Sequence, residues 1–229
     1  MRRFPWLLTV LTAAALCVLV ALGTWQVRRL QWKEGLIARA EAAAAMPPAP
    51  LDEVLRAPDP EFRRALVVCP GLPTAPFVEL QTIDDGTPGV RLVSACTPPG
   101  GDRPFLIDRG FVADEISARP PVQASTLPLA VLVQFRRTPA PGPMAPPPSG
   151  ARFFARDAAA MATALGVGEP EPFTLFALTS TNPEWAALRP SAPPAAFSNN
   201  HLGYAVTWFG LALALAGVYA AWLWRRLKG

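Results

Sequence analysis

The chain has 229 residues, a formal net charge of +4 and an apolar fraction of 51%. Most of the arginine excess flanks two long uncharged stretches, and no basic stripe with interleaved aromatics lies between them, so nucleic-acid binding is excluded as a leading function. The single histidine and three cysteines, without C-x-x-C or H-E-x-x-H spacing, also argue against a zinc site.

The first uncharged stretch runs from Phe4 to Val27 and, at ~1.5 Å per residue, is long enough to cross a bilayer. Its basic start, Arg2 and Arg3, is also typical of a signal peptide. However, the apolar run continues past Leu16 without an A-x-A-like cleavage site. We therefore predict a retained first transmembrane helix over residues 1–28.

The helical pattern continues beyond this stretch. Trp32, Leu36 and Ala40 recur at helical spacing, and Met46-Pro47-Pro48 then interrupts the pattern. We predict a juxtamembrane helix over residues 29–45. The second uncharged stretch, Leu202 to Trp224, predicts a second transmembrane helix over residues 199–225.

The central region, residues 46–198, is predicted to be a β-rich domain. Short apolar runs recur between Gly, Pro and Asp turn signals, as strands of one mainly antiparallel sheet would, in a barrel- or sandwich-like fold. Asp157 to Gly166 predicts one short helix. The six predicted strands are Ala65–Cys69, Phe77–Gln81, Val90–Ala95, Phe105–Val112, Leu129–Arg136 and Phe173–Thr179.

The charges predict the topology. Arg225, Arg226 and Lys228 follow the second stretch at once, whereas no Lys or Arg lies between Pro190 and its start. The positive-inside rule then places the tail, residues 226–229, in the cytoplasm. With two spans, the N-terminus is also cytoplasmic, and the central domain lies on the periplasmic side of a bacterial inner membrane. The bacterial assignment rests on a composition rich in Arg, Ala and Pro. Cys69 and Cys96 fall in that oxidising compartment, either as a disulfide or as two buried thiols.

Enzyme chemistry has few candidates in the central domain. A Ser-His-Asp set needs an imidazole near a hydroxyl, and the only histidine, His201, lies at the membrane boundary. The acidic pairs Asp84-Asp85 and Asp114-Glu115 occur in turn-rich sequence and are expected to be solvated loop tips. Asp108-Arg109-Gly110 is expected to form an internal ion pair that anchors a tight turn. We predict no catalytic residues and no enzymatic activity.

His201 has a distinctive helical environment. Asn199 or Asn200 is a suitable N-cap, and Tyr204, Ala205, Trp208 and Ala212 share the face of His201. This face has room for a planar apolar ligand such as haem, for which a neutral imidazole is a standard axial ligand. The alternative is an interfacial histidine that contacts water or lipid headgroups.

The glycines of this helix and two arginines of the first span give further predictions. Gly203, Gly210 and Gly217 recur on a nearly opposite face, which we expect to pack on the first span or on a partner. Arg28 and Arg29 leave the first span at the depth of His201, where they could pair with haem propionates.

Three segments resemble the Surfeit locus protein one family of cytochrome c oxidase assembly factors: GTWQVRRLQWKEGLIARAE from Gly23, FLIDRGFV from Phe105 and NNHLGYAVTWFGLA from Asn199. The resemblance implies a two-span inner-membrane protein that binds haem a as transient cargo, with His201 as the iron ligand. From their position on the face of His201, we predict that Tyr204 and Trp208 line the ring. The resemblance also implies the oxidase catalytic subunit, the haem A synthesis machinery and membrane lipid as partners. A scaffold that binds no haem and a haem-modifying membrane enzyme are the alternatives.

Overall fold

A computed structural model describes residues 4–194 and 199–228. The charges of Arg2 and Arg3 and the predicted boundary at residue 198 lie outside the described residues. Contacts divide the chain into two compact units: a helical unit of Met1–Arg39 with Pro194–Gly229, and a β unit of Ala40–Pro193.

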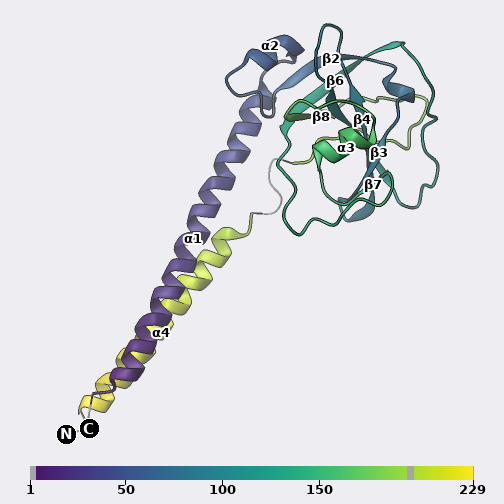
Figure 1. Ribbon diagram of the computed structural model, residues 1–229. Coiled ribbons are helices and arrows are strands. Elements are labelled where there is room, and N and C mark those ends of the chain that lie inside the picture. The colour runs from purple at the N-terminus through teal and green to yellow at the C-terminus, as the bar shows by residue number, and fades with distance from the viewer. Residues whose placement is uncertain (1–3, 195–198, 229) are drawn as a thin grey trace. The chain divides into compact units, whose positions relative to one another are not determined.

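The helical unit contains α1 (Trp6–Ala45) as far as Arg39, and α4 (His201–Lys228) (Figure 1). The predicted first span and juxtamembrane helix are one continuous helix, which ends where Met46-Pro47-Pro48 begins. Both helices are long and apolar enough to cross a membrane. Their large apolar side chains are exposed, for example Leu7 at 76% and Leu213 at 76%, which is unfavourable in water and fits a lipid environment.

α1 and α4 pack against each other in antiparallel directions. Thr9 Oγ1 lies 2.5 Å from Tyr219 Oη near the start of α1 and the end of α4. Further along, Gly23 faces the ring of Phe209, and Gln26 contacts His201. These pairs place the first turns of α1 beside the last turns of α4.

The face of α4 that packs on α1 differs from the predicted one. Ala205 and Ala212, on the face of His201, are buried. Gly203, Gly210 and Gly217 are exposed, and a Cβ added at any of them would meet no atom within 4 Å. The expectation that the glycine face packs on the first span is therefore wrong, because alanine is already small enough for this helix contact. Its alternative, packing on a partner, stays a prediction.

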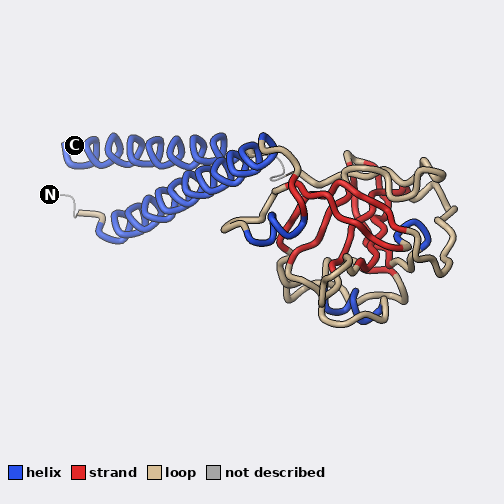
Figure 2. Tube along the Cα trace, turned by 90° about the horizontal axis from the view of Figure 1, so that it is seen from above, coloured by secondary structure: helices blue, strands red, loops and turns tan. Residues whose placement is uncertain are grey.

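The β unit is an eight-stranded sheet in the order β1-β2-β6-β8-β5-β4-β3-β7, surrounded by loops and short helices (Figure 2). All six predicted strands occur, and two short edge strands add to them. The strands are β1 (Ala49–Pro50), β2 (Arg64–Pro70), β3 (Val78–Asp84), β4 (Thr87–Cys96), β5 (Phe105–Ala113), β6 (Pro128–Arg137), β7 (Arg152–Phe153) and β8 (Phe173–Ala177).

Three short helical segments accompany the sheet. They are α2 (Leu51–Arg56), η1 (Leu72–Thr74) and α3 (Ala158–Ala164). Only α3 was predicted. Asp157 caps it by accepting a hydrogen bond from the Ala160 amide, and Gly166 adopts a left-handed conformation just beyond its end, as the sequence indicates.

The sheet is mixed, which corrects the prediction of a mainly antiparallel sheet. The pairs β1–β2, β3–β7 and β5–β8 are parallel. The β3-β4-β5 meander is antiparallel, as its short turns require. β8 follows β7 and α3 in the chain, and this long connection lets it enter the centre of the sheet parallel to β5 and antiparallel to β6.

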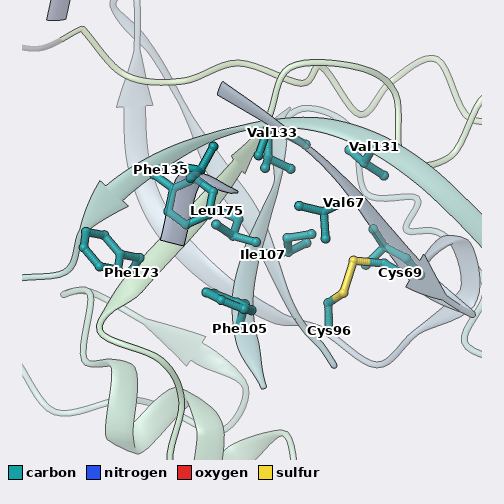
Figure 3. Packing of buried hydrophobic residues seen from close by; sticks show 14 of the residues in the cluster. Val67, Cys69, Cys96, Phe105, Ile107, Val131, Val133, Phe135, Phe173 and Leu175 are labelled. Carbon is teal, nitrogen blue, oxygen red and sulfur yellow. A yellow bond between two sulfur atoms is a disulfide. The ribbon is translucent and has the colours of Figure 1, made fainter. Parts of the chain in front are cut away.

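A large cluster of buried side chains from β2, β5, β6 and β8 forms the main core (Figure 3). Within it, the Phe135 ring packs against Phe105 and Phe173, with ring centroids 6.2 Å and 5.8 Å apart. Cys69 of β2 and Cys96 of β4 form a disulfide at one side of this cluster, with a Cα–Cα distance of 5.5 Å. Of the two possibilities left open by the sequence, the structure has the disulfide.

Removing this bond is expected to destabilise the β unit. The bond closes a loop with a sequence separation of 27, for which the chain-entropy model gives a stabilisation of about 3.5 kcal/mol. We expect the double variant Cys69→Ala/Cys96→Ala to lose about this free energy of unfolding, measured by urea-dependent pulse proteolysis. Cys17→Ala removes the exposed free cysteine and is the matched control. Equal stability of the double variant and the control would contradict the expectation.

Asp108 forms an ion pair, but with partners other than the predicted one. Its carboxylate accepts hydrogen bonds from Arg91 Nε at 2.9 and 2.8 Å and from Arg156 Nη2 at 2.7 Å. Arg109 and Asp108 are adjacent in β5 and do not pair. The predicted tight turn is a strand with a bulge: Leu92 pairs with Gly110 and Val93 with Asp108, so Arg109 is the extra residue.

Gly110 and Arg109 show what the bulge requires. Gly110 has φ of +133°, and a Cβ there would lie 2.3 Å from the Arg189 carbonyl oxygen, so only glycine fits. Arg109 is fully buried, and burial lowers its pKa to about 10, which leaves it charged at neutral pH. Its guanidinium donates to the Pro73 carbonyl at 2.9 Å and to Thr181 Oγ1 at 3.2 Å.

Candidate functional site

His201 is the first residue of α4. The Asn200 carbonyl accepts a hydrogen bond from the Tyr204 amide at 3.3 Å, so Asn200 occupies the N-cap position. No described residue donates to Asn199 Oδ1. Of the two predicted caps, Asn200 therefore takes the position, and His201 follows it in the first turn.

The imidazole of His201 contacts the first helix through one of its two nitrogens. His201 Nδ1 lies 2.6 Å from Gln26 Oε1, and Gln26 is buried at 9% exposure. A carbonyl oxygen only accepts hydrogen bonds, so Nδ1 carries the proton in this pair. The lone pair of a neutral imidazole is then on Nε2, for which the described residues supply no hydrogen bond. This tautomer is the one that binds a metal through Nε2.

A close approach of the helices brings Gln26 and His201 together. Gly23 lies one turn before Gln26, and a Cβ there would be 2.8 Å from the Phe209 ring. On α4, Ala205 is buried one turn after His201. The Trp25 ring meets the imidazole edge to face, with centroids 6.4 Å apart. Small residues thus set the helix spacing, and an aromatic ring limits the orientation of the imidazole.

Tyr204 and Trp208 lie on the same side of α4 as His201 but do not fill the contact with α1. Tyr204 is 57% exposed, and Trp208 is half-buried. Both rings are therefore available to a ligand that approaches from outside the helix pair. A planar ligand could reach these rings only from this outer side, because α1 packs against the side of Ala205 and Ala212.

The two arginines predicted near His201 differ in position. Around the axis of a helix with 3.6 residues per turn, Arg29 is rotated by about 300° from Gln26, which is close to a full turn, and Arg28 by about 200°, which is nearly the opposite side. Only Arg29 therefore lies close to the Gln26 face. Arg29 also stacks on Trp32 at 4.0 Å, and both arginines are exposed. Arg29 and Lys33 are close enough to act electrostatically on the imidazole. Lys33 was missed in the sequence, although its spacing of seven residues from Gln26 places it on this face.

Few other side chains in the chain could bind haem iron. Histidine, cysteinate, methionine and tyrosine are the usual protein ligands. Cys69 and Cys96 are joined, Met161 is fully buried, and both tyrosines lie in α4, which leaves the exposed Cys17, Met46 and Met144. An open groove of about 730 Å³ in the β unit is lined by Leu51, Leu55, Leu66, Val68, Phe105 and the 98–103 loop, without any of these ligands.

Within residues 4–194 and 199–228, no group of three or more His, Cys, Asp or Glu is arranged to hold a metal ion. A bare ion site built from several side chains is thus not found in the described chain. Haem is different, because the porphyrin nitrogens already bind the iron, and the protein needs to supply only one further nitrogen, here the imidazole of His201.

A comparison with protein-family models matches residues 13–213 to the SURF1 family. The match covers most of α1, the whole β unit and the first half of α4, and it includes Gln26 and His201. The chain belongs to the SURF1 family. This family is associated with cytochrome c oxidase assembly. A comparison with curated proteins finds no match.

Proposed function

We propose that this protein is a bacterial inner-membrane assembly factor that binds haem a and assists its insertion into the catalytic subunit of cytochrome c oxidase. The observation that carries the proposal is the contact between His201 Nδ1 and Gln26 Oε1, which leaves Nε2 as an acceptor. Membership of the SURF1 family supports the link to the oxidase, and the haem A synthesis machinery is the proposed source of the cargo.

In this proposal the protein carries haem and catalyses no reaction. His201 ligates the iron through Nε2, Tyr204 and Trp208 flank the ring, and the surrounding lipid receives the apolar tail of haem a. A single protein ligand leaves the sixth position of the iron open or weakly filled. This arrangement favours handover to a site that supplies stronger ligation.

The proposed topology has both termini in the cytoplasm and the β unit in the periplasm. Antiparallel packing of α1 and α4 supports placing the termini on one side. Arg225, Arg226 and Lys228 follow the apolar part of α4 and support the cytoplasmic side. The disulfide in the β unit supports an oxidising compartment for that unit.

The proposal is tested by expression of the full chain together with haem A synthesis. The protein is purified in detergent through a tag without histidines, and its bound pigment is extracted. We expect stoichiometric haem a and, in a host lacking the native gene, restored oxidase activity. Restored activity in a protein that neither retains nor binds haem a would establish the scaffold alternative. Turnover of haem to a modified product would establish the enzyme alternative.

The basic side chains near His201 are expected to contribute unequally to cargo binding. The variants Arg29→Gln and Lys33→Gln remove charges on the face of Gln26, where they can pair with the haem propionates. We expect each to weaken haem a binding by about threefold to tenfold, the effect of one hydrogen bond that contributes about 0.7–1.4 kcal/mol because solvent screens the exposed charge. Arg28→Gln is the matched control and should bind as the wild type. Titration of apoprotein with haem a by absorbance measures all three.

Equal effects of Arg28→Gln and Arg29→Gln would contradict the assignment by helix face. No effect from the double variant Arg29→Gln/Lys33→Gln would contradict propionate pairing altogether.

A further inference from the structure

We propose that Gln26 is a positioning residue for the haem ligand: it holds the proton of His201 on Nδ1 and orients the imidazole so that Nε2 faces the iron. This inference rests on the proposed function, because it assigns Gln26 a role through His201. Gln26 itself would not touch the cargo.

The geometry of the pair is specific. The distance between Gln26 Oε1 and His201 Nδ1 is 2.6 Å, and the two residues lie 175 positions apart in the sequence, on different helices. Gln26 is a buried polar residue within an apolar helix, where an uncompensated amide would be costly. Among the hydrogen bonds of the described residues, the contact to His201 is the one made by its side chain.

The direction of this hydrogen bond decides whether His201 can act. If the Gln26 oxygen accepts from Nδ1–H, the acceptor lone pair of the neutral ring lies on Nε2. A hydrogen bond from a ligating histidine to a carbonyl oxygen also raises the basicity of the other nitrogen and fixes the ring orientation. Gln26 therefore supplies the outer partner that metal-bound histidines ordinarily have.

The sequence around Gln26 keeps this contact in place. Gly23 allows the Phe209 ring to approach α1, and Ala205 is buried between the helices. The Trp25 ring meets the imidazole edge to face, so the ring is held by contacts on two sides. Packing of the two helices and orientation of the imidazole depend on the same contact, because separation of the helices would remove the hydrogen-bond acceptor from His201 Nδ1.

The alternative role of Gln26 is purely structural. Interhelical hydrogen bonds of polar side chains stabilise membrane helix pairs without any ligand. The two roles differ in one observable property: only a positioning residue changes the electronic character of the iron–histidine bond. Resonance Raman spectra of the ferrous, five-coordinate haem report this bond through the iron–histidine stretching frequency.

The test uses the full chain in detergent, titrated with haem a, with three single substitutions. Gln26→Met keeps the size of the side chain and removes the acceptor. Gln26→Glu keeps an acceptor and strengthens it. Gln31→Met changes an exposed glutamine of the same helix and is the matched control.

For Gln26→Met we expect a rise in Kd of roughly 10- to 100-fold, the usual effect of removing a ligand's outer partner, and a lower iron–histidine frequency. Gln26→Glu should retain binding and raise the frequency, because a carboxylate is a stronger acceptor. Gln31→Met should match the wild type in both measurements.

An unchanged iron–histidine frequency in both Gln26 variants would overturn the inference and leave Gln26 with a packing role. Even if Gln26→Met folds poorly, the Gln26→Glu spectrum decides the matter. The proposed function fails separately, if His201→Ala binds haem a as the wild type does. Loss of binding in His201→Ala with unchanged Gln26 variants would overturn only the role of Gln26.

Discussion

Replacing His201 with alanine should raise the Kd for haem a by more than about 100-fold, beyond the range expected when only an outer partner of the ligand is lost. The sequence contains one histidine, so no second imidazole can take its place. In the described β unit the cysteines are joined and Met161 is buried, so the exposed Met46 and Met144 leave a thioether as the only substitute there. Absorbance titration of the purified apoprotein measures the change.

Gln31→Met, which changes an exposed residue of α1, is the control for this experiment, and we expect wild-type affinity and an unchanged spectrum. Tyr204→Phe removes the hydroxyl one turn from His201 and keeps the ring, so it tests the phenol as an alternative ligand. A haem spectrum and Kd shared by His201→Ala and the wild type would refute the assignment of the ligand. Loss of binding in Tyr204→Phe with retention in His201→Ala would move the ligand to Tyr204.

Asp108→Ala should lower the free energy of unfolding of the β unit by about 3–5 kcal/mol, as expected when one partner of a buried ion pair is removed. Asp108 is fully buried and neutralises Arg91, which is itself 5% exposed. Without the carboxylate, Arg91 and Arg156 would remain close together around Phe176 with no counter-ion in this cluster. Urea-dependent pulse proteolysis measures the loss.

Asp52→Ala is the control for this prediction. Asp52 pairs with Arg56 on α2, but both side chains are largely exposed, so solvent screens the pair and its loss should leave stability unchanged. A stability loss for Asp108→Ala no larger than that of Asp52→Ala would show that the buried cluster does not support the fold.

The strands were predictable because their signal is local. The six predicted runs are rich in Val, Leu and Phe, and turn signals separate several of them, such as Asp85-Gly86, which has positive φ at both positions. The pairing of β8 with β5 was not predictable, since it depends on where a long connection leads rather than on the residues of β8. The partner of Asp108 was missed for a similar reason, because Arg91 is on the neighbouring strand.

The candidate site shows the same division between local and distant information. His201 stands out in the sequence as the only histidine, at the start of an apolar helix. The sequence-based prediction does not include Gln26, although an uncharged polar residue near the end of an apolar span is a signal for an interhelical contact. Helical periodicity defines the glycine face and the alanine face of α4, but it does not determine which of them packs on α1.

The most direct test of the account is isotopic labelling of the iron ligand. Because the chain has one histidine, growth with ¹⁵N-histidine labels His201 alone among its side chains, provided that the purification tag contains no histidine. We predict that the iron–histidine stretching band of the ferrous haem a complex shifts to lower frequency on labelling. A complex that binds haem a at full occupancy with no isotope-sensitive iron–nitrogen band would contradict ligation by His201.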